Sequence, residues 1–162
     1  MKQKISALLL AALYLFILSG CKEAGAAPPP AALCAQIAGA LSFEAPPTEA
    51  DAETACALYG LSAGDAEAAA WISSGGYADE CAVFTPQGAG AETIRAKITA
   101  RRDALLADYA AYRPAEVPKL QGMVLIEGRG RIVVCFSADP QAREKINALF
   151  SEEPAPESSG EG

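Results

Sequence analysis

The chain has 162 residues, enough for one domain with a real core, and a formal charge of −7 at pH 7. Twenty acidic residues against 13 basic ones exclude the basic surface by which proteins bind nucleic acids. The chain has no histidine, which excludes Ser-His-Asp and Cys-His catalysis as well as histidine-ligated metals. We therefore expect no metal, no other cofactor and no nucleic-acid partner.

The N-terminus has the pattern of a secretory leader. Lys2 and Lys4 precede an uncharged run from Ile5 to Ile17, which has signal-peptide length and is too short to span a membrane comfortably. The run ends in Leu18-Ser19-Gly20-Cys21, which resembles the lipobox of bacterial lipoproteins. The resemblance implies cleavage between Gly20 and Cys21 and acylation of the Cys21 sulfur, for example with palmitate. The alternatives are an ordinary signal peptide and a lone N-terminal helix in which the cysteine occurs by chance.

Composition divides the chain into four parts. Residues 1–20 are the expected lipoprotein signal peptide, and residues 21–30 are the acylated cysteine and an Ala/Pro tether. Residues 31–150 carry the apolar periodicity of a single domain. Residues 151–162 are acidic and rich in Pro, Ser and Gly, which is typical of a disordered tail.

The first half of the domain predicts two helices and a hairpin. Apolar residues spaced by four predict a helix over Ala31–Leu41, and early acidic residues favour a second over Thr48–Leu58. The segment Glu67–Ser74 is ambiguous, because its alanines favour a helix while its end resembles a strand running into a turn. Tyr77–Thr85 is a clearer strand.

The second half predicts a long helix over Ala91–Tyr112, a hairpin and a last helix from Asp139-Pro140 to Phe150. The hairpin joins Met123–Glu127 to Arg131–Ser137 through Gly128–Gly130. The order is therefore α-α-β-β-α-β-β-α. It predicts an α+β fold in which an antiparallel sheet of about four strands, in two hairpins, has helices packed on one face.

Four cysteines follow Cys21, all among apolar residues: Cys34, Cys56, Cys81 and Cys135. They lack Cys-x-x-Cys spacing, so neither a zinc ribbon nor a thioredoxin-type redox pair is indicated. We expect small buried packing residues. The alternative is one or two disulfides, for which Cys81 and Cys135 are the candidates because both lie on predicted strands.

Asp79-Glu80, which follows a Gly-Gly turn, is the best acidic pair for a carboxylate-based hydrolase. Neighbouring residues of a strand point to opposite faces, so these two carboxylates cannot flank one bond. We expect one of them to be solvated and the other to pair with Arg101 or Arg102.

The end of the long helix offers a candidate binding surface. Tyr109 and Tyr112 are the aromatic residues that we expect to be exposed, and Arg113 follows them. With Asp79 and Glu80, these residues are the candidates for a binding site.

From about Ala31 to Phe150 the chain resembles the domain of unknown function 4358 family, found in lipoproteins of Gram-positive bacteria. The motifs that carry the resemblance are Leu58-Tyr59-Gly60-Leu61, Tyr77-Ala78-Asp79-Glu80, Ala82-Val83-Phe84, Ile98, Arg101, Tyr112-Arg113-Pro114, Gly128–Gly130 and Ser137-Ala138-Asp139. The family has no established activity, so the resemblance implies an anchor, a fold and a cell-surface location but no catalytic residue.

Together these observations predict a monomeric protein, lipid-anchored on the extracytoplasmic face of the cell membrane. We expect it to be a non-enzymatic binding or envelope-associated module whose partner is an envelope protein or a small ligand. The alternatives are a hydrolase built on Asp79 and Glu80 and a thiol or disulfide protein using Cys81 and Cys135.

Overall fold

The computed structural model describes residues 28–74 and 76–152. The expected signal peptide, the acylated Cys21 and nearly all of the expected tail lie outside these residues. The elements in chain order are α2 (Pro30–Ala40), β1 (Pro47–Ala50), α3 (Ala52–Leu58), β2 (Ala66–Ser73), β3 (Glu80–Pro86), α4 (Ala91–Tyr112), the 3-10 helix η1 (Pro114–Glu116), α5 (Val117–Gln121), β4 (Val124–Gly128), β5 (Arg131–Phe136) and α6 (Ala142–Glu152).

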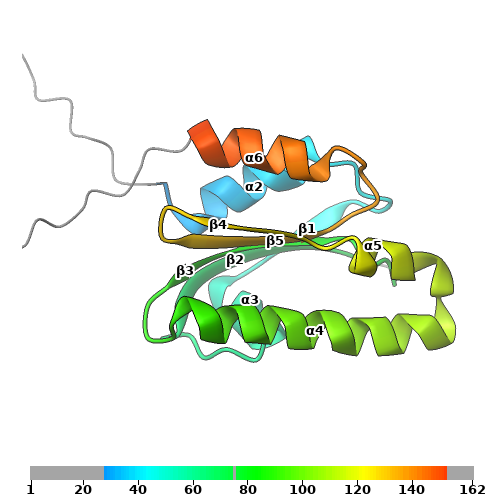
Figure 1. Ribbon diagram of the computed structural model, residues 1–162, viewed down its shortest axis with the longest axis horizontal. Coiled ribbons are helices and arrows are strands. Elements are labelled where there is room, and N and C mark those ends of the chain that lie inside the picture. The colour runs from blue at the N-terminus through cyan, green and yellow to red at the C-terminus, as the bar shows by residue number, and fades with distance from the viewer. Residues whose placement is uncertain (1–27, 75, 153–162) are drawn as a thin grey trace, which may run out of the picture.

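The five strands form one antiparallel sheet in the order β1-β2-β3-β5-β4. The α+β class is thus confirmed, but the prediction of helices on one face is wrong. Helices α2 and α6 cover one face, and α3 and α4 cover the other (Figure 1). The reason lies in the central strands, since all of β5 and residues 80–84 of β3 are buried. Continuous apolar runs of this kind are typical of strands that are covered on both sides.

The sheet separates two apolar cores. Phe84 and Phe136 point from the central strands toward the α3 and α4 side, where Ile94 and Ile98 of α4 meet them. The alternate strand residues point to the other side and pack against α2 and α6. Residues of that second core include Leu33, Ile37, Val83, Val133 and Ile146.

Strand β1 replaces the beginning of the helix expected over Thr48–Leu58. Pro47 to Ala50 pair with Ser73 to Ala70 of β2, so the open edge of the sheet determines their conformation. Helix α3 begins only at Ala52, where the Asp51 carboxylate accepts a hydrogen bond from the Thr54 amide at 2.7 Å. The fifth strand is therefore a consequence of pairing across the sheet.

Residues 67–73 of the ambiguous segment Glu67–Ser74 lie in strand β2. Ala68, Ala69 and Ala70 are buried, and both α2 and α3 pack against this strand. Small side chains let helices approach the sheet closely from both sides, which explains why a run of alanines forms a strand here.

The predicted hairpin is confirmed, with β4 and β5 paired from Val124↔Cys135 to Gly128↔Arg131. Its turn requires positive φ at Arg129 (50°) and Gly130 (72°), a conformation that glycine adopts without strain. Helix α4 has the predicted bounds, whereas η1 and α5 were not predicted. Helix α6 extends to Glu152, two residues into the expected tail.

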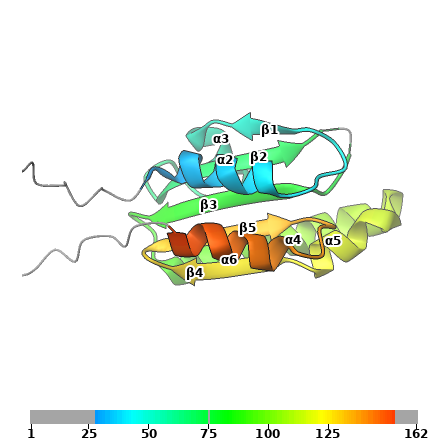
Figure 2. The same cartoon turned by 90° about the horizontal axis from the view of Figure 1, so that it is seen from above.

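The domain has two distinct ends. Helix α2 begins and α6 ends at the same end of the sheet, and α5 lies at the opposite end (Figures 1 and 2). At that opposite end the Ser42 amide donates to Asp139, which joins the loop after α2 to the loop before α6. Within the residues that the structure describes, no helix has the length and apolar character needed to cross a membrane.

Candidate functional site

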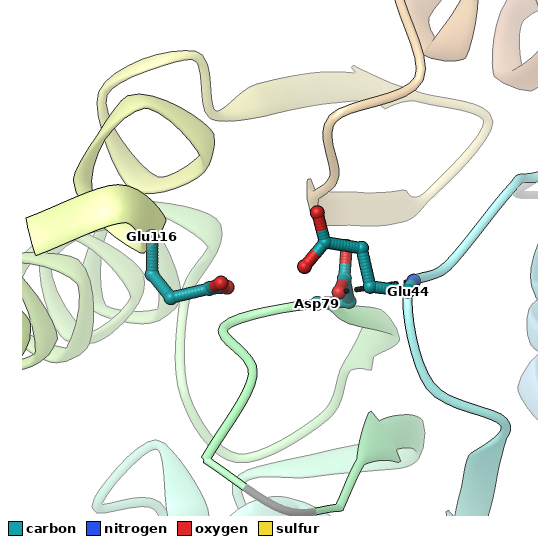
Figure 3. A group of neighbouring side chains, drawn as sticks. All are labelled: Glu44, Asp79 and Glu116. Carbon is teal, nitrogen blue, oxygen red and sulfur yellow. Dashed lines mark hydrogen bonds between the residues drawn. The ribbon is translucent and has the colours of Figure 1, made fainter. Parts of the chain in front are cut away.

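At the end of the sheet beside α5, three carboxylates converge on one buried ammonium group. The Lys119 Nζ lies 2.9 Å from Asp79 Oδ2, 2.9 Å from Glu116 Oε2 and 3.0 Å from Glu44 Oε2. Asp79 is fully buried, Lys119 and Glu116 are nearly so, and only the Glu44 side chain is half-exposed. Figure 3 shows the three carboxylates drawn together from separate parts of the chain. We call these four residues the Lys119 cluster.

Each member of the Lys119 cluster is positioned by a different element. Pro114 follows the end of α4 and starts η1, which carries Glu116, and the next turn, α5, carries Lys119. Asp79 immediately precedes β3, and Glu44 lies in the loop between α2 and β1. Backbone amides complete the cluster, since Ala78 N donates to Glu116 Oε2 at 2.8 Å and Glu44 N donates to Asp79 Oδ2 at 3.4 Å.

The electrostatics of the cluster favour its charged state. Burial alone lowers the pKa of Lys119, but the hydrogen bonds to Asp79, Glu116 and Glu44 outweigh burial and raise that pKa above its ordinary value. Burial likewise raises the pKa of Glu116, yet the Ala78 amide and Lys119 lower it below 4.5. Lys119 therefore remains protonated at neutral pH and is unsuited to act as a nucleophile or a general base.

The three carboxylates are also arranged as cation ligands, because one oxygen from each lies within 4.8 Å of the others. Carboxylate oxygens are the ligands that Ca²⁺ and Mg²⁺ prefer. In this fold, however, the Lys119 ammonium lies among them and donates to all three. A metal ion would have to displace that ammonium, so the side chains present fit a lysine-centred ion cluster better than a metal centre.

An aromatic ring covers the cluster from one side. The Arg113 guanidinium carbon lies 4.1 Å from the Tyr77 ring centroid, and the Lys119 Nζ lies 5.5 Å from the same centroid. Arg113 also lies 3.9 Å from Glu116. The structure thus brings together the Tyr77–Glu80 and Tyr112–Pro114 motifs, which are more than thirty residues apart in sequence.

A cavity of about 630 Å³ opens beside the cluster. A second cavity of about 420 Å³ shares four of its lining residues, so we treat the two as one groove, the distal groove. Residues that line the distal groove include Ser42, Glu44, Lys119, Ser137, Ala138, Asp139, Arg143 and Lys145. It lies between the loop after α2, the loop before α6, and α5.

Asp139 fixes one wall of the distal groove. Its carboxylate accepts hydrogen bonds from Lys145 at 2.7 Å, from the Gln141 amide at 2.9 Å and from the Ser42 amide at 3.2 Å. These bonds, Lys145 first, lower the pKa of Asp139. The N-terminal turn of α6 and the end of α2 are thereby held in one arrangement.

The predicted acidic pair separates, as the alternation of side chains along a strand requires. Glu80 turns to the opposite side of the sheet and pairs with Arg101, one of its two predicted partners, at 2.6 Å. Arg102 pairs instead with its neighbour Asp103. The prediction that one carboxylate is solvated is wrong, because Asp79 is buried against Lys119.

The predicted binding surface at the end of α4 is only partly present. Tyr112 is 62% exposed, as expected, but Tyr109 is buried, with the two ring centroids 5.1 Å apart. Burial and the neighbouring Tyr112 raise the pKa of Tyr109 to about 12. Since Asp79 and Glu80 are buried as well, the five predicted residues do not form one surface.

All four described cysteines are buried free thiols. Cys81 and Cys135 are register partners on β3 and β5, but the pair in contact is Cys81 with Cys34, whose sulfurs are 3.7 Å apart. The hydrogen bond with Cys34, followed by burial, raises the pKa of the Cys81 thiol well above its ordinary value. Burial does the same for Cys135. Neither thiol is prepared to act as a nucleophile.

Reasoning from the sequence missed Glu44, Glu116 and Lys119. One sequence pattern could have indicated two of them, Glu116 and Lys119. Glu116 and Lys119 are three residues apart, and Lys119 is surrounded by Val117, Pro118 and Leu120, so a helical turn there would bury a charge that needs partners. The third partner, Glu44, becomes apparent only from the fold.

A family model described as "Domain of unknown function (DUF4358)" matches residues 40–138, which span β1 to β5 and every element between them. Helices α2 and α6 lie almost entirely outside the matched range. Neither the curated proteins nor the solved structures give a significant match to the chain. The match covers more than half of the sequence, and the chain therefore belongs to the DUF4358 family.

Proposed function

We propose that this protein is a lipid-anchored, extracytoplasmic binding module that takes a small polar ligand in the distal groove. The observation that carries this proposal is the groove itself, whose first cavity, of about 630 Å³, is lined by Glu44 and Lys119 of the Lys119 cluster. That volume lies in the range of roughly 300–1,000 Å³ that is usual for small-molecule sites.

The anchor in this proposal rests on the sequence. A basic and apolar leader precedes the lipobox Leu18–Cys21, and acyl chains on Cys21 would hold the domain at the membrane. Seven residue steps lead from Cys21 to Pro28, and an extended chain of that length reaches at most about 25 Å. The Gram-positive origin and the cell-surface location that the family resemblance implies are part of the same proposal.

The orientation follows from the two ends of the domain. The chain enters where α2 begins, and α2 then runs its 11 residues, about 16 Å, toward the end that carries the groove (Figure 1). A domain tethered through Cys21 would therefore present the distal groove away from the bilayer, where a ligand or an envelope partner can reach it.

The lining of the groove points to a polar ligand of mixed charge. Glu44 and Asp139 contribute carboxylates, while Arg143 and Lys145 contribute cationic groups. Glu44 is half-exposed and Arg143 is exposed, so both can contact a ligand while the buried Asp79, Glu116 and Lys119 keep their positions. Hydrogen bonds and charge pairs of this kind fix a ligand's orientation more than they add to its affinity.

The hydrolase alternative has less support. Asp79 and Glu80 face different cations on opposite sides of the sheet, so they cannot act together as acid and base on one bond. Among the described residues, the other carboxylates near Asp79 are engaged by the protonated Lys119. The thiol alternative needs a reactive cysteine, whereas burial and hydrogen bonding raise the pKa of Cys81 and Cys135.

Amide spectra of the isotope-labelled mature protein, titrated with a library of small charged and zwitterionic fragments, test the binding site. We expect fragment-induced shifts to gather at residues 42–44 and 137–143. Arg143→Ala should weaken those shifts, and the matched variant Arg102→Ala, which changes an arginine outside the groove, should not. Shifts scattered over the surface, or equal effects of both variants, would contradict the proposed site.

A further inference from the structure

Two cysteines from distant parts of the chain lie in direct contact inside the core between the sheet and α2. The Cys34 and Cys81 sulfurs are 3.7 Å apart. Each sulfur also lies near the other residue's carbonyl oxygen, at 3.6 Å and 3.8 Å. Both side chains are fully buried, so neither sulfur contacts solvent.

The two sulfurs are in non-bonded contact, the arrangement from which a disulfide can form. A disulfide has an S–S distance of about 2.05 Å, so bond formation requires the two sulfurs to approach by roughly 1.7 Å through rotation of the side chains about χ1. The two cysteines already face each other from adjacent, packed elements, α2 and β3. Among the described residues, Cys56 is separated from these two cysteines, because it lies in the core on the other side of the sheet and donates to the Ala66 carbonyl.

Cys135 is the competitor for Cys81. It is the register partner of Cys81 on β5 and belongs to the same core. The contact between sulfurs that the structure contains is nevertheless with Cys34, and the hydrogen bonds of Cys34 and Cys81 are reciprocal. Cys34, Cys81 and Cys135 allow three pairings, and the geometry favours the pairing of Cys34 with Cys81.

We propose that Cys34 and Cys81 are joined by a disulfide in the exported protein, which covalently fastens α2 to the central strand β3. This inference rests on the proposed extracytoplasmic location, since disulfides persist in oxidising compartments. The two S–H bonds break and one S–S bond forms. The two electrons and two protons pass to the disulfide of a thiol–disulfide oxidoreductase, which is reduced to its dithiol. Because both thiols are buried in the fold, the bond forms while the chain folds.

The position of the bond gives it a mechanical role. Helix α2 is the first described element on the C-terminal side of Cys21, so any pull on the lipid anchor acts on α2 before it acts on the sheet. Helix α2 is otherwise held to β3 by side-chain packing with residues such as Leu33 and Ile37. A covalent link from Cys34 to Cys81 would transmit that load directly to the middle of the sheet.

The test is a thiol map of the full-length protein isolated from the membrane fraction of a secreting bacterial host. The protein is denatured, alkylated without reductant and cleaved after glutamate. This cleavage places the four cysteines on four separate peptides: residues 24–44, 54–67, 81–92 and 128–144. We expect peptide 24–44 to be linked to peptide 81–92, the linked mass to disappear after reduction, and the other two peptides to be alkylated.

Two variants sharpen the result. Cys34→Ala should leave peptide 81–92 alkylated, whereas Cys56→Ala should leave the link between peptides 24–44 and 81–92 unchanged. Four alkylated peptides in unreduced protein, or a link between peptides 81–92 and 128–144, would overturn the proposal.

The acyl mass on Cys21, measured on the same sample, separates this proposal from the proposed function. Lipidated protein with four free thiols would refute the disulfide and leave the anchor intact. If the protein is not exported, refolding it with oxidised glutathione still decides the pairing. A link between peptides 24–44 and 81–92 supports the geometry without the location, and four alkylated peptides overturn it.

Discussion

Arg101 and Glu80 form a two-pronged ion pair between the long helix α4 and the central strand β3. Arg101 Nε lies 2.9 Å from Glu80 Oε1, and its second nitrogen lies 2.6 Å from Glu80 Oε2. The third guanidinium nitrogen donates to the Leu58 carbonyl at 2.9 Å, and the Tyr59 hydroxyl donates to Glu80. One buried carboxylate thus joins α3, α4 and the sheet.

Arg101→Ala should destabilise the fold by about 3–5 kcal/mol, because it leaves the Glu80 carboxylate buried without its cation. Denaturant unfolding of the purified protein measures this loss. Among the described residues, the neighbouring Arg102 forms its ion pair with Asp103 near the surface, so Arg102→Ala should change the free energy of unfolding by less than about 0.5 kcal/mol. Equal effects of the two variants would show that the pair does not hold the helix to the sheet.

The pH dependence of stability follows from the depressed acidic groups. Hydrogen bonds and charges lower the pKa of Glu116 below 4.5 and that of Asp51 and Asp139 below 3.8. Their stabilisation is present above those values and is lost as the pH falls through the lower, folded-state pKa values. The midpoint temperature of thermal unfolding should therefore be nearly constant from pH 5 to 8 and should fall below about pH 4. A midpoint that rises on acidification would contradict this account.

Lys119→Met should reverse this pH dependence, so that the folded state becomes more stable as the pH falls from 7 to 5. Without the ammonium, three neighbouring carboxylates repel one another, so protonation of the folded state becomes favourable and their pKa values rise. At pH 7 the variant should lose about 3–5 kcal/mol. Between pH 7 and pH 5 it should gain stability, while the parent protein should not. Parallel pH profiles of the two proteins would show that Lys119 does not balance the cluster.

Calcium should partly replace the lysine. In Lys119→Ala the three carboxylates would keep oxygens suited to a divalent cation, and the removed side chain would leave space for one. Millimolar Ca²⁺ should raise the unfolding temperature of Lys119→Ala and leave that of the parent protein unchanged. An equal calcium response in both proteins would place the binding outside this cluster.

The parts of the fold that depend on local chemistry were predictable from the sequence. The hairpin around Gly128–Gly130 and the long helix Ala91–Tyr112 both match, because turn residues and apolar periodicity act over short distances. Strand β1 was not predictable, since Pro47 to Ala50 become a strand only through the edge of β2. The alanines of β2 have strong helix propensity, which packing on both faces of the sheet overrides.

The candidate site likewise has one part that was predictable from the sequence and one part that depends on long-range contacts. The pairing of Glu80 with Arg101 was within reach, because a carboxylate on a buried strand needs a nearby cation. The complete Lys119 cluster was not, since Glu44, Asp79 and the turn from Glu116 to Lys119 are three separate segments that meet only in the folded domain. Sequence spacing carried no information on Glu44, whose position depends on where α2 ends.

The central claim is that the domain is held at the membrane through Cys21, and the intact mass of the protein purified from the membrane fraction tests it most directly. We predict a chain that begins at Cys21 and carries the added mass of at least two acyl chains, and Cys21→Ser should release the protein or leave an uncleaved precursor. A mature chain with an unmodified Cys21, or one cleaved elsewhere, would contradict the account.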